Sequence, residues 1–225
     1  PMRGLRQSAG DLDSSDGPRG GLLVAVSGGV DSAVALHALR HEGREVRAVH
    51  MRLWPGGDRR AGGSPAALER ARDVAAALGV PFEVLDDEAG FEATVVAPFV
   101  ATYLAGETPN PCVVCNRRRF ALLARRAAEL GLDGIASGHY ARVVSCGERP
   151  RVARAADLAK DQSYMLWLLG EATLARLVLP LGTVSKEEVR ATARRLGLAA
   201  ADEPESQEVC FAAEGYRRLL ASRGV

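Results

Sequence analysis

The stretch that decides the fold is residues 21–43, GLLVAVSGGVDSAVALHALRHEG. Its first seven residues form a short, continuous apolar run, which is typical of a buried β-strand. Val34, Leu36 and Leu39 then recur at helical spacing, and Gly43 supplies the residue type that most often ends a helix. The stretch therefore predicts a strand, a glycine-rich turn and a helix.

This unit repeats along the chain. Predicted strands lie at 45–54, 81–86 and 133–140, and predicted helices at 64–79, 90–104 and 116–131. Strands that alternate with helices indicate βαβ units, whose right-handed crossovers produce a parallel sheet. We therefore expect an α/β fold with a doubly wound, open parallel sheet and helices on both faces. In such a fold, ligands bind beyond the carboxyl ends of the strands.

The pattern changes after His139. A hairpin around CGERP is predicted within 141–155, followed by helices at 161–170 and 185–197 and a loop at 200–212. These elements predict a small, mostly helical C-terminal extension. We expect residues 1–20 to be a flexible tail, 21–215 to form one domain, and 216–225 to begin a linker or a C-terminal region.

The composition is that of an ordinary globular protein. The 225 residues are 47% hydrophobic and carry a formal net charge of +1, from 29 basic and 28 acidic side chains. This balance gives no global field that would point to nucleic acid or a membrane. No apolar run approaches the roughly 18 residues of a membrane-spanning helix. We therefore expect a cytoplasmic protein without a membrane partner.

SGGVDS, residues 27–32, joins the first strand to the first helix. Its two glycines let the backbone approach an anion, the helix N-terminus presents free N–H groups, and Ser27 and Ser32 add hydroxyls. This pattern favours phosphate binding. For six residues alone, the alternative is a plain turn with Asp31 as a helix cap. The loop matches neither the dinucleotide fingerprint nor the Walker loop, and it contains no lysine.

Two cysteines stand close together in TPNPCVVCNRRRF, residues 108–120. In a reducing compartment a C-x-x-C pair is more often redox-active, metal-binding or catalytic than structural. Cys112 and Cys115 are therefore candidate functional residues. Arg117 to Arg119, or a helix N-terminus at Asn116, would lower the pKa of Cys115 and favour its thiolate.

Five motifs occur in the order SGGVDS, TPNPCVVCNRRRF, ASGHYAR, KDQSYMLW and ESQEVCF. Together they resemble the catalytic domain of the tRNA-specific 2-thiouridylases, a family of the PP-loop ATP pyrophosphatase superfamily, from about Gly21 to Tyr216. The resemblance implies an adenine nucleotide alpha hydrolase-like fold over 21–215. It also implies a tRNA-uridine 2-sulfurtransferase that uses ATP to adenylate O2 of the wobble uridine and then replaces that oxygen with sulfur.

The resemblance assigns site roles by position. For ATP it implies Ala25, Val26, Ser27, Gly28, Gly29, Val30, Asp31, Ser32, Met51 and Gly138, with Asp31 as a candidate Mg²⁺ ligand. For tRNA it implies Asn110, Pro111 and Cys112 at the target base, and His139, Lys160, Asp161 and Gln162 at other contacts. Cys115 is the implied active cysteine, and Cys210 is the second cysteine, which bears or resolves sulfur.

Cys112 departs from a well-known form of the family, which has Asp at this position. Cys112, Cys115 and Cys210 could together hold a [4Fe-4S] cluster whose open iron binds hydrosulfide. Alternatively, a persulfide delivers sulfur and leaves a disulfide between Cys115 and Cys210 for a reductant to reopen. A structural zinc site is a third possibility, but it would require a fourth protein ligand.

The implied partners are tRNA and a sulfur donor, such as a cysteine desulfurase or a sulfur-relay protein. Family members continue into further tRNA-holding domains, whereas this sequence stops at Val225, so we expect a truncated chain or a short homologue. A short homologue would instead thiolate a small molecule or free nucleobase, and a non-enzymatic nucleotide-binding or sulfur-relay protein is a further alternative. The arginines of 117–126 predict either a tRNA phosphate patch or a solvated face, and Trp167 is expected in the core or a lid.

Overall fold

The computed structural model describes residues 18, 20–54, 64–198, 209–212 and 215–223. The predicted N-terminal tail, 1–20, and the predicted loop, 200–212, lie largely outside these residues. Among the described residues, no helix is both long enough and apolar enough to cross a membrane.

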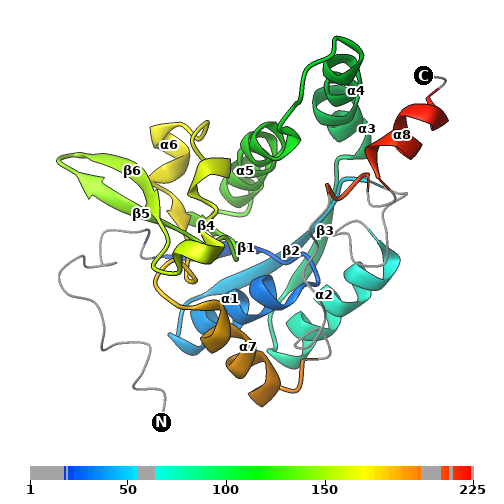
Figure 1. Cartoon of the computed structure of the whole chain (residues 1–225). Coiled ribbons are helices and arrows are strands. Elements are labelled where there is room, and N and C mark those ends of the chain that lie inside the picture. Colours follow the sequence, from blue (N-terminus) through cyan, green and yellow to red (C-terminus); the bar gives the residue numbers. More distant parts are fainter. Residues whose placement is uncertain (1–17, 19, 55–63, 199–208, 213–214, 224–225) are drawn as a thin grey trace.

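A five-stranded parallel sheet forms the centre of the fold (Figure 1). Its strands are β1 (Leu22–Ala25), β2 (Val46–Arg52), β3 (Phe82–Asp86), β4 (Gly134–Ala136) and β7 (Leu177–Val178). They stand in the order β3-β2-β1-β4-β7, so the strand order reverses between β1 and β4. Doubly wound folds bind ligands at such a reversal. The predicted fold class is confirmed, although the short strand β7 was not predicted.

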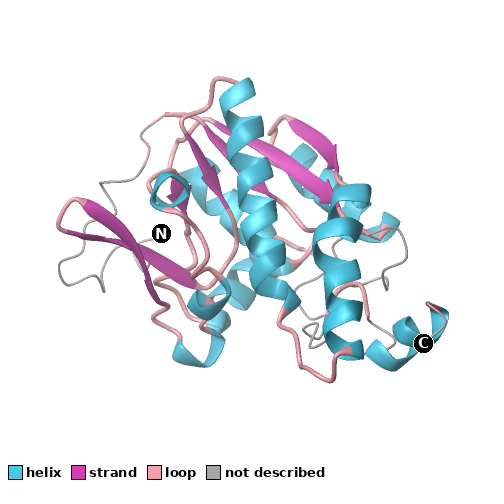
Figure 2. Ribbon diagram, turned by 90° about the horizontal axis from the view of Figure 1, so that it is seen from above, coloured by secondary structure: helices cyan, strands magenta, loops and turns pink. Residues whose placement is uncertain are grey.

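Helices cover both faces of the sheet. They are α1 (Val30–His41), α2 (Pro65–Ala77), α3 (Glu88–Phe91), the π-helical turn η3 (Glu92–Val96), α4 (Ala97–Leu104), α5 (Pro111–Glu129), α6 (Glu171–Leu174), α7 (Lys186–Arg195) and α8 (Tyr216–Ser222). Helices α1 and α2 lie on one face, with α7 packed on α1 (Figure 1). The segment from α3 to α5 lies on the other face, and α5 is the long helix that crosses the sheet at the centre of Figure 2.

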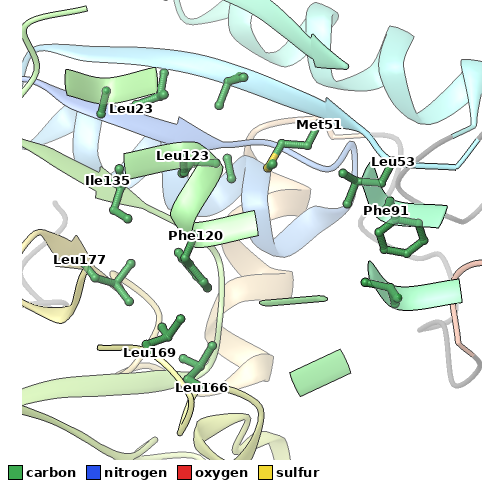
Figure 3. Close-up of a cluster of buried hydrophobic side chains, with 14 of the residues drawn as sticks. Leu23, Met51, Leu53, Phe91, Phe120, Leu123, Ile135, Leu166, Leu169 and Leu177 are labelled. Atoms are coloured by element: carbon green, nitrogen blue, oxygen red, sulfur yellow. The ribbon is translucent and has the colours of Figure 1, made fainter. Parts of the chain in front are cut away.

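The alternation of side chains along β1 explains this arrangement. Leu22 and Val24 belong to the hydrophobic cluster on the side of α1 and α2, where Leu36 is fully buried. Leu23 faces the opposite way and belongs to the larger cluster, which includes Phe91 (Figure 3). Because both faces of β1 are covered, the strand is apolar throughout, as buried parallel strands are.

The region after β4 departs in part from the sequence prediction. The hairpin is present as β5 (Ala141–Cys146) and β6 (Arg149–Arg154), which pair in an antiparallel register. The single helix predicted at 161–170 is wrong, because this segment holds only η5 (Ser163–Met165), after η4 (Leu158–Lys160). The Asp161 carboxylate accepts hydrogen bonds from the backbone N–H of Ala155 and Ser163, which fixes a turn instead of a helix.

Helix α7 begins with a capping box, in which Ser185 and Glu188 bond each other's backbone N–H groups. The helix predicted at 185–197 is therefore confirmed. Near the end of the described chain, the ring of Tyr216 in α8 stacks on Tyr103 of α4 at a centroid distance of 4.8 Å. The contact joins α8 to the main domain.

Candidate active site

The loop Ser27–Ser32 connects β1 to α1 and lies beside the reversal of strand order. Ser32 organises it from within: its buried hydroxyl accepts a hydrogen bond from Ser27 N at 3.0 Å and donates to Gly29 O at 3.0 Å. The hydroxyls of Ser27 and Ser32 lie 3.1 Å apart. The loop is therefore held in shape by its own side chains, and the buried Ser32 hydroxyl already has partners inside the loop.

Glycine is required twice around this loop. Gly28 has a φ of +82°, and a Cβ atom there would lie 2.1 Å from the carbonyl oxygen of Ala67 in α2. Gly138 follows β4, and a Cβ atom there would lie 2.8 Å from Ser32 N. The backbone after β4 thus packs directly on the first turn of α1. This close approach brings Gly138 to the phosphate loop, as the predicted nucleotide site requires.

The remaining residues predicted at the nucleotide site contribute mainly backbone. The side chains of Ala25 and Met51 are buried in the larger hydrophobic cluster, and that of Val26 is buried in the cluster beneath α1. Val30 begins α1 at the end of the loop. These side chains shape the floor of the site and cannot offer polar contacts.

Two cations that sequence reasoning missed lie at the loop. Lys186, the first residue of α7, places Nζ 2.6 Å and 2.8 Å from the two carboxylate oxygens of Asp31. The Tyr140 hydroxyl donates to Asp31 Oδ1 at 3.0 Å. On the side of α2, Arg70 Nε donates to Gly28 O at 2.9 Å. No local signal could have found Lys186, because it lies 155 residues from Asp31 in the sequence.

The two cysteines of the C-x-x-C motif lie on helix α5. The helix begins at Pro111 after the N-cap Asn110, so the expected N-terminus at Asn116 is wrong. Asn followed by Pro is itself a helix-start signal, because Pro is favoured at the first helical position. Asn110 is exposed, Pro111 is buried, and Cys112 and Cys115 are both half-buried.

Burial decides the protonation of these thiols. It raises the pKa of Cys112, with a smaller contribution from neighbouring Cys115, and it raises the pKa of Cys115 as well. Arg119 opposes the rise, through its charge and through a hydrogen bond to Cys115, but it does not overcome the burial. The expected low pKa of Cys115 is therefore wrong for this form of the protein, in which both thiols are neutral at pH 7.

Cys210 approaches the same site from the far end of the chain. Its neighbour Phe211 is buried, with ring centroids 5.7 Å from Phe91 and 5.1 Å from Phe99. Desolvation and the nearby thiol of Cys115 raise the pKa of Cys210, and the charge of Arg119 opposes part of the rise. Packing of Phe211 thus holds Cys210 near the α5 cysteines.

The three cysteines predicted to hold a [4Fe-4S] cluster are not arranged as metal ligands. Within the described part of the chain, no group of three or more Cys, His, Asp or Glu side chains is arranged to hold a metal ion. As they lie in this structure, Cys112, Cys115 and Cys210 do not form a cluster site.

The predicted tRNA contacts divide into two kinds. Gln162 is bound to Tyr140 twice, through Tyr140 N to Gln162 Oε1 at 2.9 Å and Gln162 N to Tyr140 O at 2.7 Å. Asp161 is engaged in the turn described above, so both side chains have structural partners. Lys160 ends η4 and is half-buried.

His139 lies deeper, with Nδ1 2.9 Å from the hydroxyl of Ser137 and its ring 5.6 Å from that of Phe120. Desolvation, with a contribution from the charge of Arg119, lowers the pKa of His139 to about 3. The imidazole is therefore neutral at pH 7. It can exchange a hydrogen bond with a substrate but carries no charge for a phosphate.

The arginines of α5 form less of a basic patch than the sequence suggested. Arg118 is paired with Asp87, and Arg126 is paired with Glu83 and Glu129. These carboxylates neutralise the positive charges of Arg118 and Arg126. Trp167 does not lie in the core, one of its two expected places, because 68% of its surface is exposed, while Leu166 beside it is fully buried.

Comparison with known proteins identifies the family of the chain. A family model described as the tRNA methyl transferase HUP domain matches residues 21–214. The tRNA-specific 2-thiouridylase MnmA of Syntrophotalea carbinolica is 48% identical over 198 residues, which cover 86% of this chain and 55% of that protein. The chain thus spans a little over half the length of this relative.

Two solved structures share the fold at low sequence identity. The U34-tRNA thiolase NcsA from Methanococcus maripaludis with its [4Fe-4S] cluster has a TM-score of 0.57 and 18% identity, and the match covers 97% of this chain and 68% of that one. A 4-thiouridine synthetase in complex with RNA and bound ATP has a TM-score of 0.57 and 18% identity, over 91% of this chain and 50% of that one. The match to the family model over residues 21–214 shows that the chain belongs to the tRNA methyl transferase HUP domain family, with a tRNA-specific 2-thiouridylase among its relatives.

Proposed function

We propose that this chain is the catalytic region of an ATP-dependent tRNA sulfurtransferase that converts the wobble uridine to 2-thiouridine in the cytoplasm. The observation that carries the proposal is the pairing of two sites on one fold. A pre-shaped phosphate loop stands at the reversal of strand order, and the thiols of Cys112 and Cys115 stand on α5. A relative 48% identical to this chain is a tRNA-specific 2-thiouridylase.

The first step is adenylation. O2 of the uracil attacks the α-phosphorus of ATP, so an O2–P bond forms, the bond to the bridging oxygen breaks, and pyrophosphate leaves with the electron pair. The N3 proton of uracil passes to solvent in the same step. The backbone N–H groups of Gly28 and Gly29 and the hydroxyl of Ser27 bind the phosphates. Gly138, which packs against the backbone of Asp31 and Ser32, lies beside the loop at the proposed adenosine position.

Mg²⁺ accompanies ATP as part of the substrate, and Asp31 is its proposed protein ligand. The carboxylate suits Mg²⁺ chemically, since this ion prefers oxygen ligands. Asp31 is bound by Lys186 and Tyr140 in the present structure. Its coordination of Mg²⁺ therefore requires at least part of this contact to be exchanged when ATP binds.

The second step replaces the activated oxygen with sulfur. A sulfur donor, a cysteine desulfurase or a relay protein, loads Cys210 as a persulfide. The terminal sulfur adds to C2 of the uracil, Cys115 attacks the inner sulfur and breaks the S–S bond, and AMP leaves with the C2–O2 electron pair. The products are 2-thiouridine, AMP and a disulfide between Cys115 and Cys210, which a thiol reductant reopens.

Pyrophosphate release tests the proposal, with the wobble-uridine tRNA, free uridine and uracil as alternative acceptors. We expect release to depend on tRNA, and equal release with free nucleobase would favour a small-molecule sulfurtransferase. Iron and sulfide analysis with electron paramagnetic resonance, after anaerobic purification, tests the sulfur step. Stoichiometric iron that is lost, together with activity, in the Cys112→Ala variant would replace the persulfide route with a cluster.

A further inference from the structure

The phosphate loop lacks a lysine in its sequence, and the fold supplies one from elsewhere. Lys186 Nζ lies 2.6 Å and 2.8 Å from the carboxylate oxygens of Asp31, inside the segment that forms the loop. Only 6% of the surface of Lys186 is exposed, whereas 34% of the Asp31 side chain is exposed. The buried partner is thus the cation, and the carboxylate remains open to solvent.

A buried lysine is costly at this position. Removing an ammonium group from water carries a penalty that one ion pair only partly offsets, and the N-terminus of a helix disfavours a positive charge. Stability alone would be served as well by an apolar residue at the start of α7. The placement of this charge therefore points to a role other than holding the fold together.

Lysine is rare in this chain, which makes its use at this position notable. It contains 27 arginines and only two lysines, Lys160 and Lys186. The chain thus uses arginine almost wherever it places a strong positive charge. A lysine presents a compact point charge with three donors, whereas a guanidinium is broad and planar. A compact ammonium group can donate directly to the oxygens of a single phosphate group.

The position of Lys186 is fixed from two sides. Its backbone N–H donates to Asp157 Oδ2 at 2.9 Å, and Asp157 Oδ1 accepts from Ala159 N at 3.1 Å, so one carboxylate anchors both α7 and η4. The Nζ atom lies 5.5 Å from the centre of the Tyr140 ring, whose hydroxyl also binds Asp31. These contacts fix both the backbone of Lys186 and the direction of its side chain toward the loop.

We propose that Lys186 is a phosphate-binding residue of the ATP site, held by Asp31 until ATP enters. This inference rests on the proposed function and extends it. As the bond between the α-phosphorus and the bridging oxygen breaks, negative charge collects on the departing pyrophosphate. The ammonium group of Lys186 neutralises that charge, while Asp31 is released to Mg²⁺. Fixed cations at such positions lower the barrier to phosphoryl and nucleotidyl transfer.

Binding of inorganic pyrophosphate with Mg²⁺, measured by calorimetry, tests the proposal without tRNA. We expect Lys186→Met to weaken pyrophosphate binding by at least tenfold and to leave AMP binding within about twofold, since AMP relies on the region of Gly138. Lys186→Arg keeps the charge but presents a broad, planar guanidinium, so it should bind pyrophosphate more tightly than Lys186→Met and less tightly than the wild type. Glu187→Gln, at an exposed position on the same helix, is the control and should match the wild type.

Two results for the Lys186→Met variant would decide against the proposal. Wild-type pyrophosphate affinity in Lys186→Met would overturn it. Equal losses of pyrophosphate and AMP binding in Lys186→Met would instead assign Lys186 a structural role. A wild-type protein that binds pyrophosphate normally but never thiolates tRNA would overturn the proposed function and leave the assignment of Lys186 intact.

Discussion

Lys186 and Asp31 form an ion pair with a shortest N···O distance of 2.6 Å, although 155 residues separate them in the sequence. The pair joins the start of α7 to the phosphate loop, and Tyr140 joins the segment after β4 to the same carboxylate. Three separate parts of the chain therefore meet at one side chain. Any ligand that engages Asp31 alters the contacts of all three.

Gly28 provides a direct test of the phosphate loop. Gly28→Ala places a Cβ at a φ of +82° and 2.1 Å from Ala67 O, so α2 must move. Gly43→Ala is a matched control with a φ of +79° and no atom within 4 Å of the added Cβ. Backbone strain alone costs about 1 kcal/mol.

We expect Gly43→Ala to lose about 1 kcal/mol of stability and to keep full ATP binding. Gly28→Ala should lose more stability than the control and at least tenfold in ATP affinity, measured by chemical denaturation and calorimetry. Similar losses of stability in both variants, with ATP affinity intact, would show that the approach of α2 to the loop does not shape the ATP site.

The thiols are predicted to act after adenylation. Cys115→Ser and Cys210→Ser should reduce formation of 2-thiouridine by at least about a thousandfold, because each removes a sulfur that the transfer step requires. Both variants should still release pyrophosphate from ATP in the presence of tRNA. Cys146→Ser is the control, since Cys146 is exposed at the end of β5, and it should behave as wild type. A Cys210→Ser variant that still produces 2-thiouridine at the wild-type rate would remove Cys210 from the mechanism.

His139 predicts a pH dependence of stability. Its pKa is about 3 in the folded protein, against 6.5 as the ordinary value, so the unfolded chain takes up a proton first as the pH falls below 6.5. The free energy of unfolding should then decrease by up to about 1.4 kcal/mol per pH unit between 6.5 and about 3 from this group. His139→Gln keeps a polar group for Ser137 and should flatten the dependence in that range. Parallel pH profiles for the two proteins would contradict the assignment.

The ion pair between Arg126 and Glu83 should contribute modestly. Hydrogen bonds from Arg126 lower the pKa of Glu83, so the contribution is present above the unfolded pKa and is lost as the pH falls through the folded value. Arg126→Met should lower the free energy of unfolding slightly at pH 7, because solvent screens this surface ion pair. The difference from wild type should shrink below about pH 4. A difference that stays constant to pH 3 would exclude the carboxylate as its origin.

The sheet could be predicted from sequence because each strand and helix has a local pattern. The apolar run before Ser27 and the helical spacing after it are properties of neighbouring residues, and they placed the phosphate loop at the correct edge. The segment 161–170 misled because its apolar residues suggested a helix, whereas the Asp161 side chain competes for the backbone N–H groups. Strand β7 has only two residues and was too short to leave a pattern.

The candidate site was predictable only where it is local. The phosphate loop and the C-x-x-C motif are each a continuous stretch of sequence. The roles of Lys186, Arg70 and Arg119, in contrast, depend on which distant elements pack together. The protonation of Cys115 was mispredicted because neighbouring arginines are visible in the sequence, while the burial that outweighs them is not. The sequence can therefore identify candidate residues, but tertiary packing determines their contacts and their protonation.

The central claim is tested most directly by mass spectrometry of tRNA nucleosides. The gene that encodes this chain would be deleted from a host without a second homologue, and then restored as wild type or with Cys115→Ser. The proposed function predicts that 2-thiouridine at the wobble position disappears on deletion, returns with the wild-type gene and stays absent with the variant. Undiminished 2-thiouridine after deletion would contradict it.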